Sequence, residues 1–238
     1  MKIGILYICT GKYNIFFNSF YESAEKYFVK DHEKTYYVFT DDLNIKKNNK
    51  IKIINQSFLG WPYDTMNRFH MFNSIKDQLF NEDYLFFFNA NMRFFDYVNE
   101  EIIPKKENNF LIGVNHPGYY SSHKEQFSYE RRESSLFYIP LTDGKYYYQG
   151  CLNGGKSENF LEMSQILSDM IDKDLKNNII PIYHDESALN WYFKDKNPLL
   201  MSPSYAYPES WSLPFKKIIV QMDKTKFGTY DELRQIKK

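Results

Sequence analysis

Three consecutive side chains that titrate or form hydrogen bonds, His184, Asp185 and Glu186, make the densest polar cluster of the sequence. Such groups are what chemistry on a bound ligand requires. They stand between an apolar segment at 179–182, which we expect to be buried, and a short helix predicted for residues 188–193. The other interpretation is structural, since Asp185 or the serine after Glu186 can cap that helix.

Two amides one residue apart, Asn89 and Asn91, follow the apolar run from Tyr84 to Phe88. This run has the length and composition of a strand buried on both faces. Because ligands of open α/β sheets bind just beyond the carboxyl ends of the strands, the amides indicate a binding site. A plain turn is the alternative interpretation, since Asn is frequent in turns.

Two further stretches are candidates for contact with a ligand. The pair Gly154-Gly155 precedes a predicted helix and would allow a close approach of the backbone, although a single glycine pair is weak evidence. The segment from Phe215 onward is basic. Such a segment is either a solvated end or a cover over a phosphate-bearing ligand.

The elements that must position these groups indicate a mainly parallel α/β fold. Apolar runs predict strands at residues 1–9, 35–40, 51–54, 84–88 and 110–114. Apolar residues at steps of three and four predict helices at 16–28, about 64–79 and 160–171. Strands and helices in this order are typical of a parallel sheet with flanking helices, and no linker marks a domain boundary.

The composition is that of a globular protein and argues against several classes. Of the 238 residues, 43% are hydrophobic, 25% are charged and 19% are aromatic, an excess that favours a cleft for rings. With 30 basic and 30 acidic residues, the chain lacks the basic surplus of a nucleic-acid binder. No run is long enough for a transmembrane segment or a signal peptide. Cys9 and Cys151 have no metal-ligand spacing and form no disulfide framework, which favours an intracellular setting.

The order of the motifs resembles glycosyltransferase family 6, which contains the histo-blood-group A and B transferases, the α-1,3-galactosyltransferases and their bacterial relatives. The resemblance covers nearly the whole chain, and its most specific strings are Tyr129-Glu-Arg-Arg132 and His184-Asp-Glu-Ser187. The other strings that carry it are Trp61 with Arg68, Asn89-Ala-Asn91, His116-Pro-Gly-Tyr-Tyr120, Ile139-Pro140, Tyr147-Tyr148 before Gly154-Gly155, and Ser202-Pro-Ser-Tyr205.

This resemblance implies the type A glycosyltransferase fold, a single Rossmann-like α/β domain. It implies a nucleotide-binding half at 1–95, an acceptor-binding and catalytic half at 96–214, and a basic tail at 215–238 that closes on UDP. Animal members carry a stem and a membrane anchor, whereas this chain begins at the first strand. We therefore expect a bacterial enzyme in the cytoplasm, free or peripheral at the inner face of the membrane, acting on lipid-linked or polysaccharide intermediates.

The main departure from the family concerns its metal site. Animal members have Asp-x-Asp where this chain has Asn89-Ala-Asn91, and those carboxylates hold a manganese ion that bridges to the UDP diphosphate. Hard divalent cations prefer anionic oxygens, and an amide offers only a neutral carbonyl. Bacterial relatives share Asn-x-Asn and are metal-independent, so the resemblance implies that no metal cofactor is bound. Tail cations would offset the diphosphate charge instead, and the candidates are Lys224, Lys226 and Arg234.

The resemblance also assigns the residues that bind the UDP-sugar donor. Ile8, Thr10 and Tyr13 would line the uracil and ribose pocket, and Arg68 would reach the donor. Asn89 and Asn91 would donate hydrogen bonds to phosphate or to the donor sugar.

Glu186 is the predicted catalytic residue. It would support the anomeric carbon on the face opposite the leaving UDP, as nucleophile or through its charge. Asp185 would bind donor-sugar hydroxyls. The predicted acceptor contacts are His116, Ser128, Tyr183 and His184, the last of which is also a candidate for the donor sugar.

The choice of donor depends on Gln149-Gly-Cys151. Where this chain has Cys151, the A-type transferase has Gly, which leaves room for an N-acetyl group, and the B-type transferase has Ala. Cys is larger than Ala and Gln149 is bulky, so steric exclusion favours UDP-galactose over UDP-N-acetylgalactosamine. A methyl-sized obstruction is typically worth about 1–3 kcal/mol.

The predicted function is therefore a metal-independent, retaining α-1,3 transfer of galactose or N-acetylgalactosamine to a galactose-terminated oligosaccharide or glycolipid, fucosylated or not. The alternative is a sugar- or UDP-binding protein that lost catalysis together with Asp-x-Asp. A glycoside hydrolase is disfavoured, because the sequence offers no convincing second carboxylate as general acid.

Overall fold

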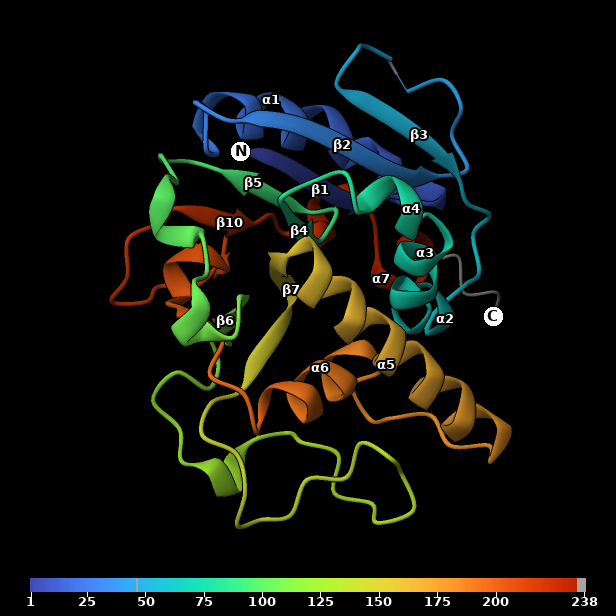
Figure 1. Ribbon diagram of the computed structural model, residues 1–238, viewed down its shortest axis with the longest axis vertical. Helices are drawn as coiled ribbons and strands as arrows, with labels where there is room; N and C mark the ends of the chain where they lie inside the picture. Colours follow the sequence, from blue (N-terminus) through green and yellow to red (C-terminus); the bar gives the residue numbers. More distant parts are fainter. Residues whose placement is uncertain (46, 235–238) are drawn as a thin grey trace.

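A seven-stranded sheet forms the centre of the protein, seen in a computed structural model that describes residues 1–45 and 47–234 (Figure 1). The strand order is β3-β2-β1-β4-β7-β6-β8, and β7 is antiparallel to both of its neighbours while all other pairs are parallel. The strands are β1 (Lys2–Ile8), β2 (Glu33–Thr40), β3 (Ile51–Asn55), β4 (Tyr84–Phe88), β6 (Leu111–Asn115), β7 (Tyr148–Lys156) and β8 (Leu199–Met201). The predicted single-domain, mainly parallel α/β fold is confirmed. Residues 235–238, the end of the predicted tail, lie outside the described residues.

The central strand β4 is apolar along its length because both of its faces are covered. Phe86 and Phe88 pack into one hydrophobic core, and Leu85 and Phe87 pack into a second core on the opposite face of the sheet. All four side chains are buried. The prediction of a strand buried on both faces is confirmed.

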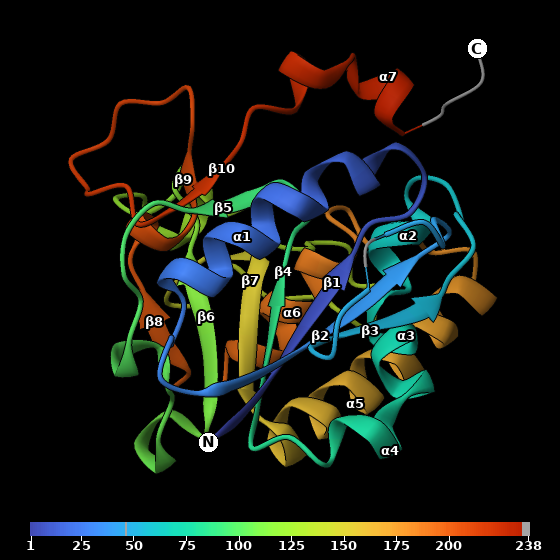
Figure 2. The ribbon, with the colours of Figure 1, turned by 90° about the horizontal axis from the view of Figure 1, so that it is seen from above.

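Helices supply the other half of each core (Figures 1 and 2). On one face, α1 (Phe17–Tyr27) follows the 3-10 helix η1 (Gly11–Phe16) and contributes Phe17, Phe20 and Ala24. The other face is covered chiefly by α3 (Arg68–Ser74), α5 (Ser157–Lys176) and α6 (Asp185–Phe193). None of the helices within residues 1–45 and 47–234 is long and apolar enough to cross a membrane.

A second, three-stranded sheet joins the residues after β4 to the carboxyl-terminal segment. Its order is β5 (Met92–Phe94), β10 (Ile219–Gln221) and β9 (Tyr207–Pro208), with β10 antiparallel to β5. Beyond β10 the chain forms η6 (Lys224–Phe227) and α7 (Tyr230–Leu233). They belong to the red segment at the top of Figure 2, above α1. The ring of Phe227 packs against Phe16 of η1, with centroids 4.8 Å apart.

The helix predicted over 64–79 is wrong in its continuity, because the structure divides it into α2 (Tyr63–Met66), α3 and α4 (Lys76–Leu79). The breaks fall at Asn67 and Ile75, whose ψ angles of 8° and 22° lie outside the helical range. The Asn67 side chain donates to the Tyr63 carbonyl, and such local bonds compete with helix formation. Of the residues at helical spacing that predict the inward face, Met66, Phe69, Phe72 and Leu79 are buried, and Ile75 is partly buried.

Two other interpretations are also wrong. The segment at 179–182 is not a buried segment, because Ile180 and Ile182 are 38% and 54% exposed. The glycine pair lies inside β7, where it permits close strand packing: a Cβ at Gly154 would lie 2.4 Å from the Leu85 carbonyl oxygen. Gly155 is similarly close to the Phe110 carbonyl oxygen, so neither glycine is explained by a ligand.

Candidate active site

A cavity, here called the cationic cavity, opens beyond the carboxyl ends of β1 and β4. It is lined by Ile8, Thr10, Tyr13, Phe58, Trp61, Asp64, Thr65, Arg68, Phe87, Asn89, Ala90, Lys224 and Arg234. Seven of the predicted donor residues therefore lie together: Ile8, Thr10, Tyr13, Arg68, Asn89, Lys224 and Arg234. The sequence did not indicate Phe58, Asp64 or Thr65 as site residues. Phe58 lies in the turn before α2, and Asp64 and Thr65 lie in α2.

Two cations of the carboxyl-terminal segment face aromatic rings in this cavity. Lys224 Nζ lies 5.1 Å from the centre of the Tyr13 ring, and Arg234 Cζ lies 4.8 Å from that of Trp61. Burial and the charge of Arg234 lower the pKa of Lys224 to about 8. In residues 1–45 and 47–234 neither cation forms an ion pair with a carboxylate. A bound anion would therefore be stabilised by charges that the protein itself leaves uncompensated.

Arg68 carries the third positive charge of the cavity, and it is already paired. Its guanidinium lies 2.8 Å from Asp185 Oδ2 and donates to the Gly150 carbonyl at 2.7 Å. It also stacks over the Phe87 ring of β4 at 4.3 Å. Burial raises the pKa of Asp185 to about 6, although the charge of Arg68 opposes the shift. Arg68 thus fixes the position of the β7 backbone and of the first turn of α6.

Glu186 lies beside the same point of β7. Its Oε2 accepts a hydrogen bond from the Gly150 backbone N–H at 2.7 Å. Burial raises the pKa of Glu186 to about 7, and the bond from Gly150 opposes this rise. Only glycine fits between the two carboxylates, since a Cβ at Gly150 would lie 2.7 Å from Asp185 Oδ2. The site therefore holds a carboxylate that ionises near neutral pH, a property typical of catalytic groups.

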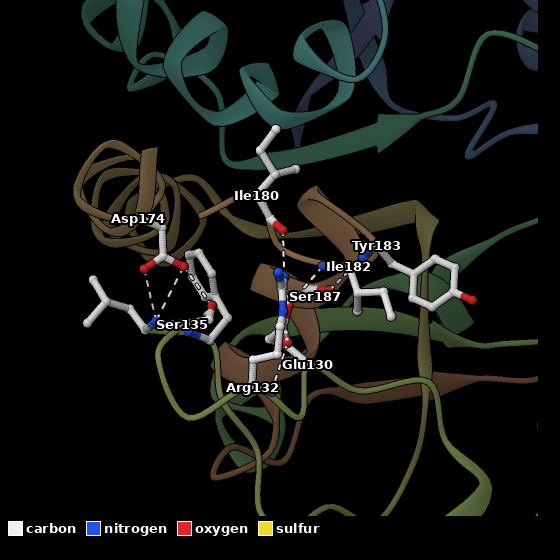
Figure 3. A network of polar contacts seen from close by, with 10 residues as sticks. Glu130, Arg132, Ser135, Asp174, Ile180, Ile182, Tyr183 and Ser187 are labelled. Carbon is white, nitrogen blue, oxygen red and sulfur yellow. Dashed lines mark hydrogen bonds and ion pairs between the residues drawn. The ribbon is translucent and has the colours of Figure 1, made fainter. Parts of the chain in front are cut away.

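A network of polar contacts around the buried Glu130 carboxylate holds the loop that leads to Glu186 (Figure 3). The Glu130 carboxylate is almost fully buried and accepts bonds from the backbone N–H groups of Arg132 and Ile182, each at 2.9 Å. Arg132 in turn donates to the Ile180 carbonyl at 2.6 Å. The segment at 180–182 is thus fixed through its backbone, which explains why its side chains remain exposed. This gives a physical role to the string Tyr129-Glu-Arg-Arg132.

Two further contacts complete this support. Ser135, a few residues after Arg132, donates to the buried carboxylate of Asp174 on α5 at 2.6 Å. Past the loop, Ser187 Oγ accepts from the Tyr183 N–H at 3.0 Å. His184 between them has a φ of 53°, an unusual conformation for a residue with a side chain. The network therefore holds a strained turn immediately before the two carboxylates.

A second depression, here called the aromatic groove, adjoins the cationic cavity and shares Lys224 with it. It is lined by Asn91, His116, Pro117, Gln149, Pro208, Glu209, Ser210, Trp211, Gln221, Met222, Asp223, Lys224 and Tyr230. Burial lowers the pKa of His116 to about 4, so its ring is neutral at physiological pH. The Trp211 ring is 47% exposed and was missed from the sequence. The available signal was an aromatic residue in a polar turn directly after the buried residues 205–207.

Several predicted site residues, Asp185 and Glu186 among them, lie outside the linings of both depressions. Lys226 pairs with Glu209 at 2.5 Å, and the Ser128 hydroxyl is bonded to that of Tyr119. Tyr183 is exposed, and the His184 ring packs edge-on against Trp61 at 5.0 Å. Cys151 is buried, and its thiol donates to Gln149 Oε1 at 3.4 Å.

The two amides at the position of the family's metal site do not suit a divalent cation. Asn89 Oδ1 faces the Arg68 guanidinium at 3.5 Å, and Asn91 Nδ2 donates to the Met222 carbonyl at 2.8 Å. A cation at Asn89 would meet the Arg68 guanidinium, and Asn91 would offer it only Oδ1, a neutral carbonyl oxygen. Across the described parts of the chain, no three His, Cys, Asp or Glu side chains gather as a metal-ligand set.

Comparison with known proteins identifies relatives over the full length of the chain. Residues 1–234 match the family described as glycosyltransferase family 6. The chain is 38% identical to the O-antigen biosynthesis glycosyltransferase WbnI of Escherichia coli, covering 99% of this chain and all of the relative. It is 32% identical to histo-blood group ABO system transferase 1 of Rattus norvegicus, covering 91% of this chain and 64% of the relative. It is 30% identical to globoside alpha-1,3-N-acetylgalactosaminyltransferase 1 of Gallus gallus, covering 98% and 69% respectively.

Proposed function

Because this chain belongs to glycosyltransferase family 6, we propose that it transfers galactose or N-acetylgalactosamine from a UDP donor, with retention of configuration and without a metal ion. The acceptor is a galactose-terminated glycan, and the new linkage is α-1,3. The name of the Gallus gallus relative includes that linkage, and the name of the Escherichia coli relative points to a polysaccharide acceptor.

The observation that carries this proposal is the charge of the cationic cavity. Lys224 and Arg234 reach it without carboxylate partners in the described residues, and both lie on aromatic rings. A diphosphate supplies the missing negative charge, and the rings suit a uracil base. Near an effective dielectric constant of 20, each cation at 4 Å from a phosphate charge contributes roughly 4 kcal/mol. Two such cations replace much of what a metal would supply to the leaving group.

Glu186 supplies the carboxylate of the reaction. The bond from the anomeric carbon to UDP breaks, and a bond from the acceptor oxygen forms on the same face of the sugar. The acceptor proton leaves with the diphosphate. Glu186 supports the positive charge on the anomeric carbon from the opposite face, as nucleophile or as an electrostatic partner. The Gly150 N–H and the Arg68–Asp185 pair hold the carboxylate at its place beside β7.

The aromatic groove receives the acceptor. Its exposed Trp211 ring offers a flat apolar face to a galactose ring, and neutral His116 offers hydrogen bonding without charge. The groove and the cationic cavity share Lys224, so donor and acceptor meet there. Because one relative is a protein of Escherichia coli, we further propose that the reaction takes place in the bacterial cytoplasm, free or peripheral to the inner membrane face.

The test is release of UDP from UDP-galactose and from UDP-N-acetylgalactosamine, with lactose or 2′-fucosyllactose as acceptor, in EDTA and again with manganese. The proposal predicts full activity in EDTA. Activity that appears only with manganese would overturn the metal-free part of the proposal. UDP binding without turnover under every condition would favour the sugar- or UDP-binding protein instead.

A further inference from the structure

The two amides that follow β4 have different partners. Asn89 lines the cationic cavity, and its Oδ1 faces the Arg68 guanidinium. Asn91 is only 5% exposed, and its Nδ2 donates to the Met222 backbone carbonyl at 2.8 Å. In return, the Met222 N–H donates to the Asn91 backbone carbonyl at 2.8 Å. Asn89 thus faces the proposed donor site, and Asn91 is bonded to the carboxyl-terminal segment.

This pair of bonds ends the ladder between β5 and β10. Gln221 is paired with Met92 in the antiparallel register, and the bonds between Met222 and Asn91 come directly after it. The next residue is held as well, since the Asp223 N–H donates to Glu209 Oε2 at 2.7 Å. Lys224 follows immediately and enters the cationic cavity. The contact at Asn91 therefore fixes the course of the backbone that leads to Lys224.

An amide is required at residue 91 for this contact. The Met222 carbonyl oxygen needs a hydrogen-bond donor, and the amide nitrogen of Asn91 supplies it. An ionised aspartate has only acceptor oxygens, so Asp at this position would place two oxygens against each other. The amide that replaces the family's metal-binding carboxylate thus has a structural function of its own.

We propose that Asn91 is a positioning residue: it docks the carboxyl-terminal segment on β5 and so holds Lys224 in the cationic cavity. Its effect on catalysis rests on the proposed function, whereas the docking itself does not. The residue that offsets the diphosphate charge and the residue that brings it into place are then in separate parts of the chain, and two hydrogen bonds between Asn91 and Met222 join these parts.

The competing role for Asn91 is direct contact with a sugar through Oδ1. This oxygen is buried and has no hydrogen-bond partner among the described residues. Asn91→Asp separates the two roles, because it retains the oxygen acceptor and removes the nitrogen donor. If the Asn91 side chain serves only a sugar contact through Oδ1, the backbone bond from the Met222 N–H to the Asn91 carbonyl keeps the segment docked in the variant. If Asn91 acts on the segment, the variant releases it.

Hydrogen exchange of the unliganded protein, followed by mass spectrometry over residues 219–227, is the first test. Loss of one hydrogen bond in Asn91→Asp should speed exchange of this segment by about tenfold. Asn89→Asp is the matched control, since it adds the same charge two residues away and should not speed exchange there. Unchanged exchange of β1 and β4 establishes that Asn91→Asp is folded. Equal exchange of residues 219–227 in Asn91→Asp and the wild type would overturn the proposal.

The second test is a double-mutant cycle on the donor KM in EDTA. Asn91→Asp should raise this KM roughly as much as Lys224→Ala does, and the double variant should resemble Lys224→Ala alone. Additive effects would contradict docking as the route by which Asn91 acts. Because exchange is measured without substrate, an inactive wild type would overturn the proposed function and leave the docking testable. Activity in EDTA together with unchanged exchange would support the proposed function and overturn the docking by Asn91.

Discussion

The cationic cavity and the aromatic groove lie side by side and share Lys224, but they differ in charge. The cavity holds three cations, Arg68, Lys224 and Arg234, and one carboxylate, Asp64. Of the three cations, only Arg68 has an ion-pair partner in the described residues. The groove is lined by charged side chains of both signs, Glu209, Asp223 and Lys224. Glu209 is paired with Lys226, and the His116 ring is neutral. The cavity thus suits a polyanion and the groove suits an uncharged sugar. The two substrates of a UDP-sugar transferase differ in the same way.

The largest effect is expected for Glu186→Gln, which removes the negative charge held beside Gly150 of β7. Its kcat should fall by about 10³-fold, while the KM values for both substrates change little. In the wild type, kcat/KM should rise with pH through about 7, because Glu186 must be ionised. It should fall above about pH 8, where Lys224 loses its proton. The measurements are steady-state kinetics and pH profiles of UDP release.

The raised pKa of Glu186 also makes a prediction about stability. Its folded-state pKa lies above the ordinary value of 4.5, so the folded protein loses stability as the pH rises from about 4.5 to about 7, and the full destabilisation persists above pH 7. Glu186→Gln should therefore have a higher Tm than the wild type at pH 8, and this difference should shrink as the pH falls toward 4.5. A lower Tm at pH 8 would mean that the carboxylate is stabilised in the fold.

The next largest effect is expected for Lys224→Ala and Arg234→Ala. Each removes a charge-assisted contact to the diphosphate and should raise the donor KM by about 10- to 100-fold. Lys226→Ala is the matched control, since this lysine pairs with Glu209 outside the cavity. It should change the donor KM only slightly. An equal loss in all three variants would mean that general positive charge, rather than the cavity, binds the donor.

A smaller effect is expected for Trp211→Ala, which removes the exposed ring of the groove. The acceptor KM should rise by about tenfold, in keeping with the loss of a ring-stacking contact, and the donor KM should stay the same. Trp211→Phe should recover part of the loss. An effect confined to the donor KM would contradict the division between groove and cavity.

The smallest effect is expected for Cys151→Gly. The Cys151 thiol is buried and bonded to Gln149. It can therefore affect the donor sugar only indirectly, by changing how the side chains of β7 pack. The preference for UDP-galactose over UDP-N-acetylgalactosamine should fall by about fivefold, near the lower limit for a methyl-sized obstruction. The ratio of kcat/KM for the two donors measures this preference. An unchanged ratio would exclude Cys151 from donor selection.

The sequence predicted the fold because its strongest signal, hydrophobic periodicity, is local. The run from Tyr84 to Phe88 had to be covered on both faces, and the structure covers it with two cores. The break at Asn67 was not visible in that signal, since it depends on one side chain bonding to its own helix. The exposure of Ile180 was also unpredictable, because Glu130 and Arg132 hold that segment through backbone groups.

The site was predicted in part for a related reason. Residue type and family pattern located Thr10, Tyr13 and Lys224, and the structure brings these together in one cavity. They did not distinguish Asn89 from Asn91, because the difference lies in a contact with Met222, far away in the sequence. Lys226 was selected for its charge alone, but the turn of η6 directs it to Glu209.

The most direct test of the difference between the two regions is the salt dependence of both KM values, measured on the wild type in EDTA. A charged donor reaches the cations of the cavity through solvent, where salt screens the attraction, whereas salt does not affect the approach of an uncharged acceptor. The account predicts that the donor KM rises steeply with salt concentration while the acceptor KM stays constant. A donor KM that is independent of salt, or an acceptor KM that rises in parallel with it, would contradict the account.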